Sequence, residues 1–477
     1  MGTAELTKKN ASRNEPKDFL DEVISNSSAR LSSIDFVKDK QSKALKRLKE
    51  TGFPNKSIED WKYYDFTEVL NADYQLSQAI KPKPEEIESY KDLIAEYIYP
   101  ETQNSILVTV NGVFNEELSD LSAFNTEAIE ILNFNKAEDL KSHPNSKEIA
   151  KKFFAQDADR EDNFFKSTNT ALMSNGFLLD VKNNFRSEKS LQVLHISNAN
   201  TFNQTRSLIH LGKNAELDIV IDYVGLDDTK YFTNAVIEII LEENAKLKSD
   251  KTQNESKSAI QMYNLRAKLE RSSKFELNLF SFGAQSSRND IRVDINGEGA
   301  DAIVNGLYVT GEKRKSHNLI VINHNVPNCT SNQLFKGLLY DEARAEFNGT
   351  VNVKEEAQQT YAEQLNRNLL LSDKATIDTR PQLNIFADDV KCSHGATIGQ
   401  LEEDELFYLE SRGIAKDEAT TLLTYSFCEE LIQKVKLESA RKLLSRLAVR
   451  NLNKGIVSLE NLQEGKEVNR ESKKWKQ

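Results

Sequence analysis

The feature that most restricts the fold is a short turn of small residues, followed by an apolar strand, that recurs through the middle of the chain. Its early copies are spaced about 27 to 30 residues apart, and the later ones are irregular. This length is typical of a solenoid, in which each coil leaves its apolar face open until the next coil stacks on it. The copies are Asn214-Ala-Glu-Leu217, Asn244-Ala-Lys-Leu247, Ser272-Ser-Lys-Phe275, Gly299-Ala-Asp-Ala302, Glu342-Ala-Arg-Ala345, Lys374-Ala-Thr-Ile377 and Gly395-Ala-Thr-Ile398.

The residues around these turns indicate strands. From about Gly176 to Gly399, short runs of Val, Ile, Leu, Phe and Thr alternate with Asn, Gly, Asp and Ser, with little helical period. A β-sandwich also has many short strands, but it gives no reason for a repeated small-residue corner. We therefore predict a mainly β fold built on a parallel β-helix.

Helical patterns flank this region on both sides. Apolar residues recur at helical spacing from Leu31 to Leu48, and again in three stretches after Gly399. The sequence thus predicts four regions: a disordered tail at 1–28, a mostly helical region at 29–172, the β-helix at 173–400, and a helical domain at 401–477 that ends in a charged tail.

Charge and apolar content exclude several classes of protein. The net charge of -11 argues against a nucleic-acid partner, because such proteins usually cluster Lys and Arg. No apolar run reaches the roughly 18 residues of a membrane span, and the polar opening has no apolar core like that of a signal peptide. Three cysteines fit a reducing compartment better than a disulfide framework. We expect a cytoplasmic protein with free thiols and no membrane partner.

Signatures of common enzymes are missing from the sequence. It contains no phosphate-binding P-loop, no dinucleotide-binding glycine motif, no H-E-x-x-H zinc motif and no G-x-S-x-G nucleophile elbow. We therefore expect a non-catalytic protein.

One short stretch carries residues that bind soft metals. In an extended strand, Cys392 and His394 point to the same face, roughly 6.6 Å apart along the chain. A thiolate and an imidazole are both ligands for iron or iron-sulfur clusters, but a cluster generally needs four ligands. A partner would have to supply the rest. From the residues alone, a buried cysteine and a hydrogen-bonded histidine remain the alternative.

Other candidate residues are better explained by structure. His317, His324 and Cys329 match no standard zinc spacing, and Cys428 lies on an apolar helix stripe, where packing is expected. That stripe must pack on neighbouring helices or dock in a partner. It runs through Ala419, Leu423, Phe427, Leu431 and Val435, with Leu422 and Ile432 beside it.

Taken together, these segments resemble the SufB/SufD family of iron-sulfur cluster assembly proteins. The matching elements cover most of the chain beyond about residue 50. They are Gly52-Phe-Pro54, Glu59-Asp-Trp-Lys-Tyr63, Tyr231-Phe-Thr-Asn234, His324 to Cys329, Ser331, Gln333-Leu-Phe-Lys-Gly337, Phe347-Asn-Gly349, Gln364, Asn368-Leu-Leu-Leu-Ser372, Arg380-Pro-Gln-Leu383, Asp389-Val-Lys-Cys-Ser-His-Gly-Ala-Thr397, Leu406-Phe-Tyr-Leu409 and Ser411-Arg-Gly413.

Two differences favour the SufD branch of this family. SufB proteins typically carry an E-H-E-A-T-like sequence where this chain has Cys392 to Thr397, and cysteines near the places of Asn366 and Ala375. The resemblance implies a right-handed parallel β-helix that pairs with SufB through its C-terminal end and binds the SufC ATPase through its C-terminal helices. We expect Leu422, Leu423 and Phe427 to face SufC.

The resemblance also implies a site at the SufB seam. His394 and Cys392 would contribute there to a transient cluster shared with SufB, and the isolated subunit would hold no cofactor. Without SufB the chain can pair with a second copy of itself. Two other functions remain open at this point: an architectural clamp with no ligand role, and a β-helix enzyme that cleaves polysaccharides, which shares the architecture but is usually exported.

Overall fold

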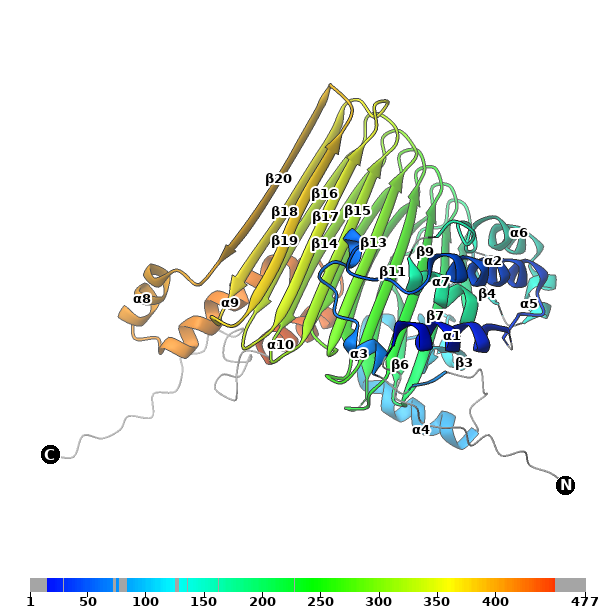
Figure 1. Cartoon of the computed structure of the whole chain (residues 1–477), viewed down its shortest axis with the longest axis horizontal. Coiled ribbons are helices and arrows are strands. Elements are labelled where there is room, and N and C mark those ends of the chain that lie inside the picture. The colour runs from blue at the N-terminus through cyan, green and yellow to red at the C-terminus, as the bar shows by residue number, and fades with distance from the viewer. Residues whose placement is uncertain are drawn as a thin grey trace.

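The computed structural model contains a long solenoid with helices along its sides (Figure 1). It describes residues 15–450 apart from 29, 72–73, 77–83, 125–127, 135, 162 and 227. Successive strands of the solenoid alternate between two ten-stranded sheets, and within each sheet they stack in parallel on the strands of the preceding coil. The predicted mainly β fold with a parallel β-helix core is confirmed.

The two sheets are best followed by strand number. The odd-numbered strands form one sheet: β5 (Phe177–Val181), β7 (Thr201–Leu211), β9 (Phe232–Leu241), β11 (Ile260–Leu269), β13 (Ser286–Ile295), β15 (Lys315–His324), β17 (Arg344–Val353) and β19 (Thr376–Ile385). The even-numbered strands form the other: β6 (Leu191–Ser197), β8 (Glu216–Gly225), β10 (Lys246–Asn254), β12 (Lys274–Ser281), β14 (Asp301–Thr310), β16 (Thr330–Leu339), β18 (Thr360–Leu370) and β20 (Val390–Gly399). Alternate apolar residues of both sheets fill the space between them.

The repeated turns are the corners of the coils, and their backbone explains their composition. Asn214, Asn244 and Gly299 have φ angles of 58°, 59° and 74°, in the left-handed region that Asn and Gly tolerate best. The residue that follows is small because it turns into the core, and Cys329 occupies this position in a later coil with no exposed surface. The last predicted copy is wrong: Gly395 lies inside β20, where the chain is extended.

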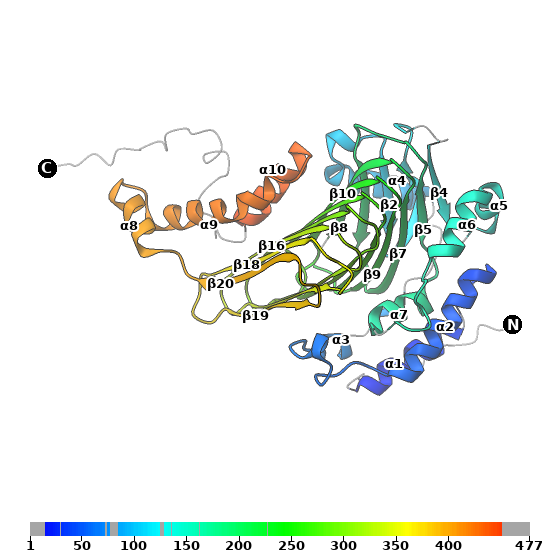
Figure 2. The ribbon, with the colours of Figure 1, turned by 90° about the horizontal axis from the view of Figure 1, so that it is seen from above.

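The N-terminal region contains both helices and strands. It comprises α1 (Pro16–Ser28), α2 (Asp35–Thr51), η1 (Glu59–Trp61), α3 (Thr67–Leu70), β1 (Gln75–Leu76), α4 (Pro84–Ile94), η2 (Ala95–Tyr97), η3 (Pro100–Thr102), β2 (Ile106–Val110), β3 (Val113–Asp120), β4 (Ile129–Asn133), α5 (Ala137–Ser142), α6 (Pro144–Phe153) and α7 (Phe164–Leu172). Strands β2 and β4 pair with β6 and β5 and so extend the two sheets. Helices α1, α2 and α7 lie along the outside of the odd-numbered sheet (Figure 2).

The prediction of a disordered tail at 1–28 is wrong for residues 16–28, which form α1. This helix buries Phe19 and Val23, and the Phe19 ring lies 6.2 Å from that of Phe164 and 6.0 Å from that of Phe202. Burial of these two side chains against the solenoid, with Leu20 packed beside them, stabilises the helix. Residues 1–14 lie outside the described part of the chain, as does the predicted charged tail after residue 450.

A segment at residues 52–70 runs across the outer face of the odd-numbered sheet. The Trp61 ring lies 4.0 Å from the guanidinium of Arg288 on β13, and Glu59 forms an ion pair with Arg380 on β19. A cation over an aromatic face is attracted by the ring, most strongly where water is excluded. The N-terminal segment is thus tied to coils as far as the last one.

Three C-terminal helices follow the solenoid: α8 (Glu403–Ser411), α9 (Lys416–Ile432) and α10 (Glu438–Arg450). The end of α9 and all of α10 pack on the outside of the even-numbered sheet, where Leu431 and Leu444 meet Phe280 and Leu338. In Figure 2 these helices lie on the opposite side of the solenoid from α1 and α2. No helix in the described part of the chain is both long and apolar enough to span a membrane.

Both sheets are open at their C-terminal end. β19 and β20 are the last strands of their sheets, and each pairs with a neighbour on one side only. The residues of β19 and β20 are half-buried or exposed along the whole length of both strands, unlike those of the strands before them. This end, at the upper left of Figure 1, is where the solenoid stops without a cap.

A buried histidine near the other end makes the stability of the fold depend on pH. His195 on β6 stacks 4.3 Å from the Tyr223 ring and shares a 2.7 Å hydrogen bond with Thr109 Oγ1. Burial lowers the pKa of His195 to about 3. Below about pH 6.5, His195 therefore binds a proton in the unfolded chain but not in the folded chain. The free energy of unfolding falls as the pH falls.

We expect the His195→Gln variant to lose this dependence, because glutamine still offers Thr109 a hydrogen bond but does not titrate. Between pH 6 and pH 4, its free energy of unfolding should fall less steeply than that of the wild type by about 1.4 kcal/mol per pH unit. Urea unfolding across this range measures the slope, with His143→Gln as the control at a half-exposed histidine. Parallel curves for wild type and His195→Gln would contradict the prediction.

Candidate functional site

Cys392 and His394 lie on β20, and both are on the face that lines the inside of the solenoid. β20 pairs with β18 so that Cys392 lies beside Ala362, and His394 lies beside Gln364. Both of these β18 residues are buried. Cys392 packs against a small apolar cluster that includes Val351. The structure therefore places the thiol and the imidazole on one face, at the open end.

The two side chains differ in their access to solvent. Cys392 is half-buried, whereas His394 is exposed. Burial raises the pKa of the Cys392 thiol above its ordinary value. Because the thiolate is the form that binds iron, a proton competes with the metal at Cys392 in the isolated chain. His394 is thus the more accessible of the two side chains.

Polar side chains fill the inside of the solenoid just behind β20. Asn366 accepts hydrogen bonds from Asn368 Nδ2 at 2.6 Å and from Thr379 Oγ1 at 2.8 Å. It donates in turn to the Tyr308 hydroxyl at 3.2 Å. All of these groups except Thr379 are buried. This end of the interior thus presents amides and hydroxyls to whatever occupies the space beside His394.

Few side chains that could bind a metal lie close together in the described part of the chain. Among the described residues, no three His, Cys, Asp or Glu side chains come close enough together to hold a metal ion. Cys392 and His394 supply one sulfur and one nitrogen, whereas a cluster takes four ligands. Any cluster bound at these two residues would need further ligands from outside the described chain.

The other histidines and cysteines have structural surroundings. His317 shares a 2.9 Å hydrogen bond with Glu346, and His324 shares one of 2.8 Å with Ser331. Both histidines are buried, and the pKa of each is lowered by burial. The three cysteines are free thiols, and burial raises the pKa of Cys428 to about 12. These groups do not join the site on β20.

The predicted stripe on α9 is divided between two surroundings. Leu431 and Val435 belong to the core against the even-numbered sheet. Phe427 faces the same way: its carbonyl accepts a 2.8 Å hydrogen bond from Lys336 Nζ, which lies 4.7 Å from its ring. Leu422 and Leu423, nearer the start of α9, are half-exposed.

Helix α8 adds an apolar surface that sequence reasoning did not assign to a site. None of its residues is buried, and the side chains of Phe407 and Tyr408 are 71% and 57% exposed. Exposed aromatic residues side by side are a mark of an interaction surface. The only signal in the sequence was the Leu406-Phe-Tyr-Leu409 motif itself, since a short helix gives too few turns to show which face is covered.

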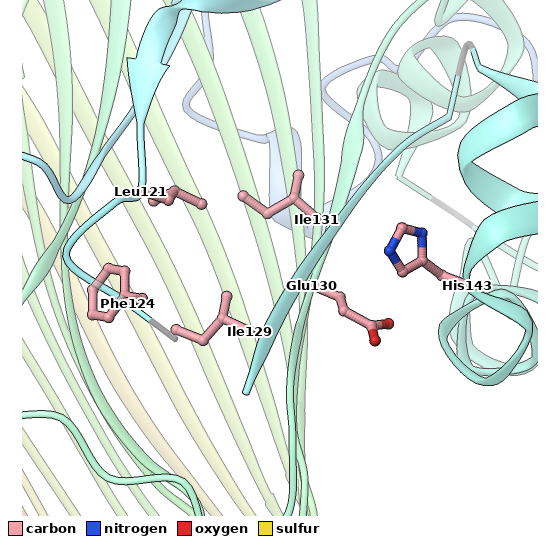
Figure 3. Close-up of a pocket in the computed structure, with 6 residues that line it drawn as sticks. All are labelled: Leu121, Phe124, Ile129, Glu130, Ile131 and His143. Carbon is pink, nitrogen blue, oxygen red and sulfur yellow. The ribbon is translucent and has the colours of Figure 1, made fainter. Parts of the chain in front are cut away.

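A hollow lies beside β4, at the opposite end of the solenoid, and nothing in the sequence pointed to it. Its lining is formed by Leu121, Phe124, Ile129, Glu130, Ile131 and His143 (Figure 3). Glu130 points to the other side of β4 from Leu121 and Phe124 (Figure 3). Its carboxylate already accepts a 2.8 Å hydrogen bond from Lys182 Nζ and another from Ser146. The hollow is otherwise mainly apolar and suggests no reaction.

Comparison with known proteins gives consistent matches along the chain. Residues 194–427 match the SufBD core domain of the SUF iron-sulfur cluster assembly system, and residues 21–193 match the SufBD N-terminal region. The chain is 31% identical to the iron-sulfur cluster assembly SufBD family protein slr0076 of Synechocystis, over 84% of this chain and 88% of that protein. It is 30% identical to the iron-sulfur cluster assembly protein SufD of Escherichia coli, over 85% and 91% of the two chains.

Proposed function

The chain belongs to the SufBD family of iron-sulfur cluster assembly proteins, and we propose that it is the SufD-type, non-catalytic subunit of a complex with SufB and the SufC ATPase. The observation that carries this proposal is the open end of the solenoid. There, Cys392 and His394 share a face at the last strand of a sheet, with too few ligands around them to hold a cluster alone.

The free edges at this end support a heterodimer. An edge strand presents unpaired backbone N–H and C=O groups, which favour pairing with a strand of another chain. β19 and β20 are ten residues long each, and apolar side chains at or near the ends of these strands are exposed, among them Ile385, Phe386 and Ile398. A SufB subunit pairing here would cover these edges. It would also bring its own ligands next to His394.

Helix α8 and the start of α9 supply a separate surface for SufC. Phe407, Tyr408 and the half-exposed Leu422 and Leu423 lie before the part of α9 that packs on the solenoid. In this role the subunit transmits movements of the ATPase to the solenoid, because α9 continues directly from the exposed surface into the packed one. Nucleotide chemistry remains with SufC.

We expect Tyr408→Asp and Leu423→Asp to weaken SufC binding while leaving the pairing with SufB intact. A charge in place of an aromatic or aliphatic anchor typically costs about 2 kcal/mol or more, which is roughly a thirtyfold loss of affinity. Co-expression with SufB and SufC, followed by sizing and quantification of the purified complex, measures both contacts.

Phe427→Asp is the informative comparison in this experiment. Because Phe427 contacts Lys336 of β16, its replacement should lower the stability of the helical domain as well as SufC binding. Loss of SufB together with SufC in the Tyr408→Asp complex would show that α8 supports the fold. Unchanged recovery of SufC with Tyr408→Asp and Leu423→Asp would exclude this surface as its binding site.

A further inference from the structure

The carboxamide of Gln364 lies next to His394 in a row of stacked side chains. Gln333 on β16 pairs with Gln364 on β18, and Gln364 pairs with His394 on β20. Neighbouring strands lie about 4.8 Å apart, so residues in register stack directly on one another. His394 is therefore the next residue in the row after the carboxamide of Gln364.

The hydrogen bonds in this row leave one acceptor unused. Gln364 Nε2 donates to Gln333 Oε1 at 3.1 Å. Only 2% of the surface of Gln364 is exposed. Its Oε1 atom is buried and has no hydrogen-bond partner among the described residues. A buried acceptor without a donor costs about 1 to 3 kcal/mol. His394, the next residue in the row, carries ring N–H groups that could donate to it.

The opposite sheet leaves room for the carboxamide. Gly349 on β17 faces Gln364, and a Cβ at residue 349 would lie only 2.3 Å from Gln364 Nε2. Any larger residue there would push the carboxamide out of its place. Because Gly349 has no side chain, it leaves room for Gln364 in the row. The amide group of Gln364 lies toward the odd-numbered sheet.

From this geometry we propose that Gln364 is a positioning residue for His394, and the proposal rests on the ligand role given to His394 above. A hydrogen bond from one ring nitrogen of His394 to Gln364 Oε1 fixes the tautomer of the imidazole. The other ring nitrogen then keeps its lone pair and faces the open end. Histidines that bind metals are commonly oriented by such a second hydrogen bond, whose loss costs about 10-fold to 100-fold in affinity or activity.

The test uses three variants. Gln364→Leu removes the acceptor at similar volume, Gln364→Glu retains an acceptor, and Glu363→Gln is the control at the neighbouring residue of β18, whose exposed side chain lies on the opposite face of the strand from Gln364. The ring ¹⁵N signals of His394, assigned by comparison with His394→Ala in the purified ¹⁵N-histidine-labelled chain, report the tautomer. Cluster yield is measured in complexes with equal SufB and SufC content.

We expect one dominant tautomer in the wild type, Gln364→Glu and Glu363→Gln, and a mixture in Gln364→Leu. The Gln364→Leu complex should form clusters about 10-fold to 100-fold less efficiently. Ring signals that do not change in Gln364→Leu would overturn the proposal. If the signals change but His394→Ala forms clusters as the wild type does, the positioning contact is real, and the ligand role of His394 is the part that fails.

Discussion

Replacing His394 with alanine is expected to leave the complex with SufB and SufC assembled and to abolish most of its cluster formation. The side chain is exposed at the open end, so its loss removes no packing from the isolated subunit. Alanine can neither ligate iron nor carry a proton near neutral pH. Since loss of a residue that only hydrogen-bonds to a metal-binding side chain already costs about 10-fold to 100-fold, loss of the binding side chain itself should cost at least as much.

The control variants test whether the effect belongs to the imidazole. Ser393→Ala changes the neighbouring exposed residue, which alternation places on the opposite face of β20, and should have no effect. Cys392→Ala should have a smaller effect than His394→Ala, because its thiol is half-buried with a raised pKa. Cys428→Ala, far from the site in the α9 core, should have little effect on the yield. A wild-type yield from an intact His394→Ala complex would leave an architectural clamp as the better account.

The solenoid was predictable because its rule is local. Each corner needs a residue that tolerates positive φ and then a small residue that turns inward, as at Asn214 and Asn244, and both requirements appear directly in the sequence. Helix α1 was not predictable in this way. Among its apolar residues only Phe19 and Val23 are fully buried, and the rings that Phe19 meets lie far away in the sequence, at Phe164 and Phe202.

The candidate site shows the same distinction between features that follow from nearby residues and features that depend on residues far apart in the sequence. Cys392 and His394 are two positions apart in the sequence, and alternation along a strand places such residues on one face. The stripe on α9 gave no such answer, because an apolar face looks the same whether it covers the solenoid, as Leu431 does, or a partner, as we propose for Leu423. Nor does sequence reveal that Gln364 lies beside His394, since their register depends on the length of the whole coil between them, which includes β19 and two turns.

A charge at the open end should separate this subunit from SufB. Ile398 lies on β20 with 51% of its surface exposed, and partner strands at this edge would cover it. In the Ile398→Asp variant, an uncompensated carboxylate would be buried on pairing, at a cost of several kcal/mol. A cost of only about 3 kcal/mol already weakens binding roughly a hundredfold. We therefore expect Ile398→Asp to lose the heterodimer at micromolar concentrations, as measured by light scattering after size exclusion.

The isolated chain extends this test, because its free edges can also pair with a second copy. Wild-type protein alone should form dimers, and Ile398→Asp should be monomeric with an unchanged urea midpoint, since the side chain is half in solvent already. Phe407→Asp is the matched control: it adds the same charge at an exposed apolar residue of α8, and it should keep both the homodimer and the SufB pairing. A heterodimer of Ile398→Asp and SufB with wild-type affinity would mean that the partner binds elsewhere than at β20.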